Sequence, residues 1–195
     1  MISNKDRSGW FGASETRCIV GNYETKSFRS WWLEKLGLRI NNLTNLSMMA
    51  GTNYEHKILD AVVPFARKDH QILIPELKLR VNYDGDTNDA VHEVKTYSWK
   101  RGFKLHSYYQ QQVWVQQYAK RVARGMIISY GLMANDYKNF FNDIDMNRVG
   151  FHPIMYSEEF IEATYLPRLR YLCDCLERTA LPKNIHLEEY LCNQN

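Results

Sequence analysis

The sequence predicts an α/β fold in which a central mixed β-sheet is flanked by helices. Stretches whose apolar residues recur at helical spacing alternate with short β-branched runs that are typical of strands. The length of 195 residues suits one domain, residues 1–195, with a sizeable hydrophobic core. The run Val91–Thr96 predicts a functional site on this fold, because it carries a glutamate and a lysine two positions apart.

The composition is that of an ordinary globular protein. Hydrophobic residues make up 45% of the chain and aromatic residues 13%, which argues against intrinsic disorder. A formal net charge of +3 neither requires nor excludes a nucleic-acid partner, because what matters is where the charges lie. The first residues lack the apolar core of a signal peptide and no stretch approaches a membrane span, so we expect a cytoplasmic protein with no membrane partner.

The first element is predicted to be a helix entered through the loop Gly9–Thr16. Ser14 is a reasonable N-cap for it, and Glu15 suits its first turn. A helix N-terminus with a serine hydroxyl and exposed N–H groups can hold an anion, and Arg7 is close enough in sequence to contribute. A plain capped helix explains the same residues, so both interpretations stay open.

Two more helices are expected before the first strand. One spans residues 27–36 and ends at Gly37, with aromatic residues on its packing face. The next begins at about Asn53 and stops near Pro64. Glu55 lies on the side of its apolar stripe, where a carboxylate is costly unless it is paired, protonated or bound to metal. The alternative is a glutamate near a helix start that favours the helix dipole.

An acidic hairpin is the centre of the predicted site. The alternating run 77–83 predicts a strand that leads to Asp84, and residues 88–89 suit a two-residue tip. Asp84 then lies opposite Glu93, and two like charges so close repel each other unless a divalent cation lies between them. Glu93 and Lys95 point to the same face of the sheet because strand side chains alternate.

Two ordinary explanations compete with this interpretation. Asp-Gly is a common turn dipeptide, and a Glu-x-Lys strand can be a solvent-exposed face with a weak surface ion pair. In addition, a register error of one step would put Asp86 or Asp89 in the place of Asp84.

The segment after the hairpin, residues 96–104, is basic and interleaved with aromatic residues. Its cations are Lys100, Arg101 and Lys104. Such a loop can grip phosphates electrostatically, and it can equally be a solvated connection.

A helix expected over residues 105–122 carries five glutamines. Gln112 shares a face with apolar neighbours, so it is predicted to point inward. An inward amide needs hydrogen-bond partners, and a metal-bound water or Lys95 would provide one.

The rest of the chain predicts three further elements. Residues 125–130 form one strand and residues 151–156 another, weakened by Pro153. The last helix runs from Ser157 to about residue 176, with an interruption near Pro167. The tail from residue 181 carries no clear pattern.

The four cysteines are predicted to be free thiols. Cys18, Cys173, Cys175 and Cys192 lack the paired spacing of a zinc site. One early and three late cysteines also match the layout that holds an iron–sulfur cluster in some enzymes. Cys173 and Cys175 lie two apart in a predicted helix, which aims their sulfurs apart, so the cluster is disfavoured.

Taken together, the motifs resemble those of the PD-(D/E)xK nuclease superfamily, and within it the phage lambda exonuclease and YqaJ-like viral recombinase group. The resemblance spans most of the chain, with its pieces in the same order. They are Arg7-x-Gly9 with Gly12-Ala13-Ser14-Glu15, then Gly51-Thr52-Asn53-Tyr54-Glu55, then Asp84-Gly85 with Glu93-Val94-Lys95, and finally Gln112-Val113. The chain departs from the group's pattern at Tyr83, where proline is common, and at Asn82, where a small hydroxyl residue is common.

The resemblance implies a restriction-endonuclease-like core and a Mg²⁺-dependent exonuclease that digests linear double-stranded DNA, 5′ to 3′, leaving 3′ overhangs for recombination. Mg²⁺, or Mn²⁺ in its place, would be held by Glu55, Asp84, Glu93 and the Val94 carbonyl. Lys95 would orient or deprotonate the attacking water or stabilise the phosphorane, and Gln112 would steady Lys95 or the water. DNA ends would be bound by Arg7, Ser14, Asn82, Lys100, Arg101 and Lys104.

The resemblance also implies partners and a setting. Relatives assemble as a homo-trimeric ring around duplex DNA and work with a single-strand annealing protein, and they are encoded by phages or prophages in a bacterial cytoplasm. Three alternatives stay open: an endonuclease of the same fold, an iron–sulfur nuclease, and a non-catalytic DNA-binding module.

Overall fold

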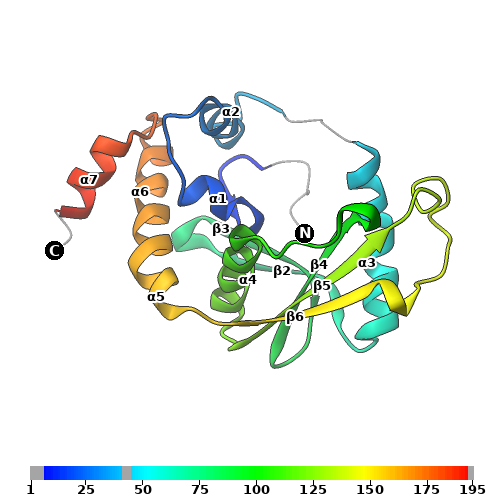
Figure 1. Cartoon of the computed structure of the whole chain (residues 1–195). Helices are drawn as coiled ribbons and strands as arrows, with labels where there is room; N and C mark the ends of the chain where they lie inside the picture. Colours follow the sequence, from blue (N-terminus) through cyan, green and yellow to red (C-terminus); the bar gives the residue numbers. More distant parts are fainter. Residues whose placement is uncertain (1–6, 41–44, 193–195) are drawn as a thin grey trace. The chain divides into compact units, whose positions relative to one another are not determined.

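The structure is a computed structural model that describes residues 7–40 and 45–192. It is an α/β fold with a mixed six-stranded sheet flanked by helices, as predicted. The elements, labelled in Figure 1, are β1 (Phe11–Gly12), α1 (Thr16–Ile19), α2 (Lys26–Lys35), α3 (Leu46–Val62), β2 (Arg67–Ile74), β3 (Leu79–Asp86), β4 (Ala90–Ser98), α4 (Ser107–Lys120), β5 (Arg124–Leu132), β6 (Val149–Met155), α5 (Glu158–Phe160), α6 (Leu166–Glu177) and α7 (Asn184–Cys192). Within the described part of the chain, no helix has both the length and the apolarity that a bilayer crossing requires.

The chain divides into two compact units. The first comprises Met1–Asn42, Ile72–Val81 and Ser157–Asn195, and the second comprises Leu43–Gln71 and Asn82–Tyr156. Two compact units can belong to one domain, so the expectation of a single domain stays a prediction.

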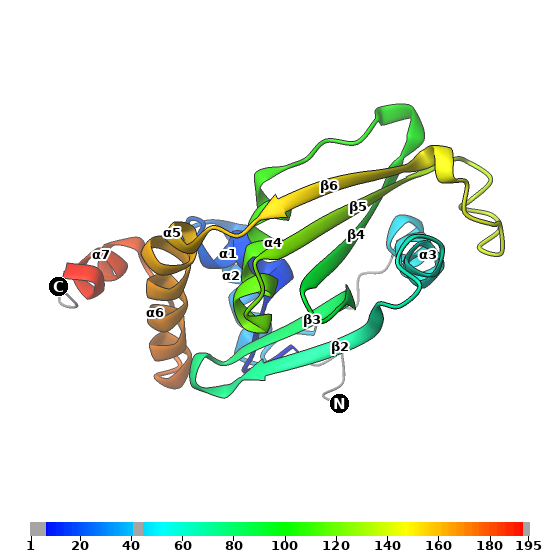
Figure 2. The same ribbon diagram turned by 90° about the horizontal axis from the view of Figure 1, so that it is seen from below.

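Strands β4, β5 and β6 of the second unit run side by side (Figure 2). β4 pairs with β5 in parallel, and β5 pairs with β6 antiparallel, which makes the sheet mixed. The parallel pair is joined by α4, as a parallel connection requires a crossover. Pro153 lies opposite Met126 in β6, the last strand of the order, where a residue without an N–H is tolerated.

Helices α3 and α4 cover opposite faces of this sheet. Successive side chains of β4 alternate between contact with α3 and contact with α4. Val94 belongs to the hydrophobic core on the α3 side, whereas its neighbour Glu93 is hydrogen-bonded to α4. The core consists of Ala50, Tyr54, Ile58, Leu59, Val94, Ile128, Tyr130 and Leu132. A close approach is required at Gly85, where a Cβ atom would lie 2.9 Å from Leu59 Cδ2 and 3.3 Å from Ala66 Cβ.

Helix α3 begins earlier than the sequence predicted. Its N-cap is Asn45, whose side chain accepts a hydrogen bond from the Met48 N–H at 2.9 Å, and not Asn53. Glu55 is therefore in the middle of a helix of 17 residues. The helix-dipole explanation for Glu55 is wrong, since that effect is confined to the first turn.

The first unit is built on aromatic packing. Phe11, Phe28, Trp31 and Trp32 form ring contacts with one another, and Trp32 donates from Nε1 to the Ala180 carbonyl at 3.0 Å. Phe28, Trp31 and Trp32 lie on the apolar face predicted for the second helix, and that helix ends as expected before Gly37, whose φ is +70°.

The C-terminal helix shows the predicted interruption. Ser157 caps α5 by accepting from the Phe160 N–H at 3.2 Å, and a single π-helical stretch, Ile161–Tyr165, precedes α6. Pro167 lies in the first turn of α6, directly after the π-helical stretch, and this irregularity accommodates a residue without an N–H. Helix α7 follows in the segment for which the sequence made no prediction.

Candidate active site

The hairpin formed by β3 and β4 has the predicted register. Gly85 pairs with His92 and Asp86 with Val91, and the Thr87 N–H donates to the Ala90 carbonyl at 3.0 Å. Residues 88–89 are thus the two-residue tip. One step beyond the last pair, Asp84 Oδ2 accepts a hydrogen bond from the Val94 N–H at 2.7 Å, which holds this carboxylate beside β4.

Glu93 and Lys95 meet on one face of β4. Lys95 Nζ lies 2.5 Å from Glu93 Oε1, with 20% and 4% of the two side chains exposed. The weak surface ion pair that the sequence left open is therefore excluded, because exposed pairs of that kind are solvated on both sides.

Two glutamines of α4 complete the environment of Glu93. Gln112 Nε2 donates to Glu93 Oε1 at 2.6 Å, and Gln112 Oε1 accepts from Lys95 Nζ at 3.1 Å. Gln116 Nε2 donates to Glu93 Oε2 at 2.5 Å and is fully buried. The inward orientation of Gln112 was predicted and Gln116 was missed, although its position four residues later places it on the same helix face.

The Glu93 carboxylate helps to raise the pKa of both Glu55 and Asp84. Burial, and then repulsion by Glu93, raises the pKa of Glu55 to about 7. Burial, Glu93 and Glu55 together raise the pKa of Asp84 well above its usual value. Burial alone would lower the pKa of Lys95, but the attraction of Glu93 and Asp84 outweighs it and raises that pKa.

This electrostatic pattern fits a divalent cation. One ammonium faces three carboxylates, and the Glu55 carboxylate has no hydrogen-bond donor among the described residues. Oxygen ligands from carboxylates and a backbone carbonyl are the set that Mg²⁺ or Mn²⁺ prefers. Glu55, Asp84, Glu93 and the Val94 carbonyl have the ligand chemistry for such an ion. Among the described residues, however, the three carboxylates do not form a group whose ligand atoms all lie within 4.8 Å of one another, so they would have to draw together around it.

The two rival carboxylates have cations of their own. Asp86 is 1% exposed and accepts hydrogen bonds from Arg67, at 2.8 Å, and from Lys120. Burial opposes ionisation of Asp86, yet these bonds outweigh it and lower the pKa of the carboxyl group. Asp89 pairs with Arg124 at 3.0 Å on the surface. Both are therefore neutralised locally, whereas Asp84 is not.

The basic loop after β4 is anchored by its aromatic residues. Trp99 packs so closely on β5 that a Cβ atom at Gly131 would lie 2.3 Å from its ring, and Phe103 stacks on His152 with centroids 4.4 Å apart. The cations Lys100, Arg101 and Lys104 are left exposed. Asn82 is also exposed, and its Oδ1 accepts from Gln71 Nε2 at 2.8 Å. Contact of these side chains with DNA stays a prediction.

The N-terminal expectation needs a correction. Ser14 is not an N-cap: it is exposed within a 3₁₀ turn, Ala13–Glu15, whose N-cap is Gly12. The buried Glu15 carboxylate takes the capping role, accepting from the Gly12 N–H at 2.8 Å, and pairs with buried Lys35 at 2.7 Å. Arg7 lies 3.7 Å from the same carboxylate. A glutamate three residues after the cap is favoured because its longer side chain reaches back to the N–H.

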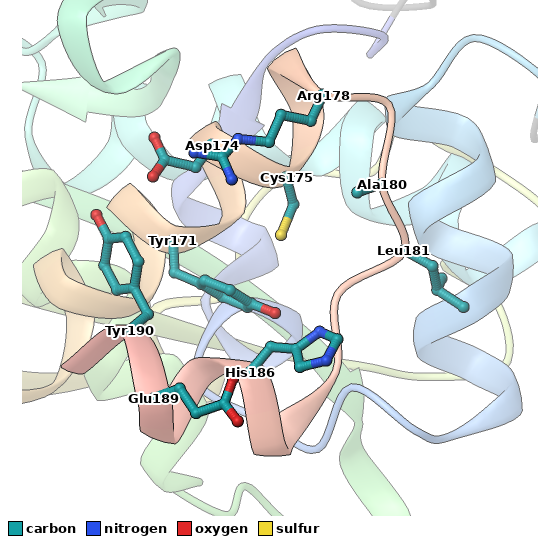
Figure 3. Close-up of a pocket in the computed structure, with 9 residues that line it drawn as sticks. All are labelled: Tyr171, Asp174, Cys175, Arg178, Ala180, Leu181, His186, Glu189 and Tyr190. Atoms are coloured by element: carbon teal, nitrogen blue, oxygen red, sulfur yellow. The ribbon is translucent and has the colours of Figure 1, made fainter. Parts of the chain in front are cut away.

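All four cysteines are free, and Cys173 and Cys175 are buried. Among the described residues, no cysteine belongs to a group of metal-ligating side chains close enough to share an ion. Figure 3 shows where Cys175 lies: it lines a pocket of about 340 Å³ in the first unit together with Tyr171, Asp174, Arg178, Ala180, Leu181, His186, Glu189 and Tyr190. None of the residues of the acidic site lines this pocket.

The mixed sheet, with an aspartate, a glutamate and a lysine on one hairpin, has the fold of solved exonuclease structures. The alkaline exonuclease LHK-Exo from Laribacter hongkongensis has this fold. It is 18% identical to the chain and aligns over 89% of this chain and 94% of its own, with a TM-score of 0.62. The same enzyme in complex with dAMP gives a TM-score of 0.64.

A phage-related exonuclease from Haemophilus somnus 129PT is also similar in structure, with 11% identity, coverage of 95% of this chain and 96% of that chain, and a TM-score of 0.59. No family model and no curated protein sequence matches the chain. The resemblance drawn from the sequence motifs is therefore confirmed at the level of the fold.

Proposed function

We propose that the protein is a Mg²⁺-dependent exonuclease that hydrolyses phosphodiester bonds of linear double-stranded DNA. The observation that carries the proposal is the cluster of Asp84, Glu93 and Lys95 with Glu55, in which three carboxylates share one ammonium. Support comes from the fold, which is that of two exonucleases. One of them was determined with dAMP, the type of product that an exonuclease releases from DNA.

The residues of the chain have separate roles in this reaction. Glu55, Asp84 and Glu93 would hold a divalent cation, which would supply a Lewis acid for activating water and offsetting charge on the scissile phosphate. Lys95, which is paired with Glu93, would orient or deprotonate the attacking water or stabilise the charge that develops on the phosphate. Gln112 and Gln116 fix the orientation of Glu93 through both of its oxygens.

DNA-end recognition and polarity extend the proposal. Exposed Lys100, Arg101 and Lys104 provide the positive charge that a phosphate backbone requires. Recognition of a 5′-phosphate by Arg7 and Ser14, with digestion from 5′ to 3′, follows from the motif resemblance. The same resemblance motivates a trimeric ring and an annealing-protein partner in recombination.

The test compares three substrates in Mg²⁺: linear duplex with 5′-phosphate ends, linear duplex with 5′-hydroxyl ends, and closed circular duplex. The proposal predicts fastest loss of the phosphorylated linear DNA, intact circles, and no reaction in a chelator. Equal digestion of all three substrates would exclude end recognition and favour an endonuclease.

A pair of variants tests the site itself. Asp84→Asn should abolish hydrolysis, whereas Asp89→Asn, on the same hairpin but paired with Arg124 at the surface, should keep it. Retained hydrolysis in Asp84→Asn would show that the acidic site is misassigned.

A further inference from the structure

A second set of metal-ligating side chains adjoins the acidic site. Glu55, His56 and Asp69 each offer one ligand atom, and these atoms all lie within 4.8 Å of one another. His56 follows Glu55 on α3, and Asp69 comes from β2. His56 Nε2 and Asp69 Oδ2 are 3.1 Å apart, close to the separation of two ligands on one metal ion.

The chemistry of this set differs from that of the acidic site. An imidazole with two carboxylates suits Zn²⁺, which binds nitrogen and oxygen at about 2.0 to 2.2 Å with four ligands. Mg²⁺ prefers oxygen alone and keeps several waters. The set of Glu55, Asp84 and Glu93 thus favours Mg²⁺, and the set of Glu55, His56 and Asp69 favours Zn²⁺.

An ordinary surface ion pair explains only part of the set. His56 and Asp69 are 47% and 65% exposed, so their contact alone would be a solvated pair of little energetic consequence. It does not account for Glu55, which is half-buried beside them and has no hydrogen-bond donor among the described residues. A cation that Glu55 shares with His56 and Asp69 would account for all three.

We propose that Glu55, His56 and Asp69 form a zinc site, and that Zn²⁺ bound there inhibits the enzyme by drawing Glu55 away from the acidic site. The inhibitory half rests on the proposed function, while the zinc site does not. Open positions in the coordination sphere would be filled by water, because only three protein ligands converge.

Zinc binding is measured first, without any substrate. The full chain is stripped of metal and titrated with ZnCl₂ at one fixed Mg²⁺ concentration, so that competition for Glu55 is the same in every variant, and binding is followed by calorimetry. One zinc ion per chain is expected, with affinity lowered about 100-fold or more in His56→Ala, since even indirect partners of a metal cost about 10- to 100-fold.

Asp60→Asn is the matched control. Asp60 lies on the same helix and pairs with Lys68 from β2, as His56 pairs with Asp69, but its partner cannot ligate a metal. Unchanged affinity in Asp60→Asn and loss in both His56→Ala and Asp69→Asn is the expected result. Equal zinc affinity in His56→Ala and the wild type would overturn the zinc site.

Inhibition is then measured as the zinc concentration that halves the Mg²⁺-dependent rate, each variant being compared with its own zinc-free rate. The half-inhibiting concentration should rise in His56→Ala by about the same factor as the loss of zinc affinity. Unchanged inhibition despite lost binding would overturn the inhibitory role. Absence of any Mg²⁺-dependent hydrolysis in the zinc-free wild type would instead overturn the proposed function and leave the zinc site standing.

Discussion

Replacing Lys95 by methionine tests whether its ammonium and a divalent cation compete for the carboxylates of the acidic site. The variant keeps the length of the side chain but removes the ammonium that lies 2.5 Å from Glu93 Oε1. Breaking a buried ion pair costs about 3 to 5 kcal/mol, and the 20% exposure of Lys95 reduces this to about 2 to 3 kcal/mol. For a chain of this size the melting temperature in chelator should fall by roughly 4 to 12 °C.

Magnesium should then stabilise the variant more than it stabilises the wild type. In the wild type, the ammonium and a divalent cation compete for the same carboxylates, so removal of the ammonium strengthens cation binding. A ligand at 100 times its Kd contributes about 2.7 kcal/mol, and tighter binding raises that value. Thermal unfolding with and without Mg²⁺ measures the difference.

Lys120→Met provides the comparison. It also removes an ammonium from a buried carboxylate, Asp86, but Asp86 retains Arg67 and lies outside the acidic site. This variant should be destabilised in chelator and show the same Mg²⁺ shift as the wild type. The same Mg²⁺ shift in both variants and the wild type would refute the cation site.

Three further predictions concern the same site. Glu93→Ala should lower the release of acid-soluble nucleotides in Mg²⁺ by about 10³-fold, a loss of several kcal/mol of transition-state stabilisation. The circular dichroism spectrum of the variant should be unchanged, and retained activity would contradict the assignment of Glu93. Gln116→Leu should slow hydrolysis about 10- to 100-fold by releasing Glu93 Oε2, whereas Gln110→Leu should not, and equal losses would show a general effect on α4. In chelator, thermal stability should fall as pH rises from 4.5 to about 7, because Glu55 in the folded chain still holds a proton that the unfolded chain has released. Glu55→Gln should make thermal stability less dependent on pH, and calorimetry across that pH range measures the difference.

The hairpin was predictable because its geometry is local. Strand alternation and a two-residue tip determine which side chains face each other, so the neighbourhood of Asp84, Glu93 and Lys95 followed from a short stretch of sequence. The inward direction of Gln112 followed in the same way from helical spacing.

Features that depend on distant partners were not predictable from the pattern. Glu15 is buried because Lys35, twenty residues later, pairs with it, and nothing near Ser14 in the sequence signals this. The start of α3 at Leu46 was missed because glycine and asparagine within the segment are poor helix formers that tertiary packing overrides. Asp69 likewise reaches Glu55 and His56 only through the pairing of β2 in the sheet.

Gly85 gives the acidic site a property that has nothing to do with charge. A methyl group at this position would collide with the Leu59 side chain of α3 and press on Ala66, so α3 packs closely on the hairpin here. Gly85→Ala should widen the gap between α3 and the hairpin and with it the spacing of Glu55 and Asp84. Ca²⁺ needs longer bonds and more ligands than Mg²⁺, so a wider spacing would favour Ca²⁺. The size of ion that the protein selects would then depend on Gly85, which has no side chain.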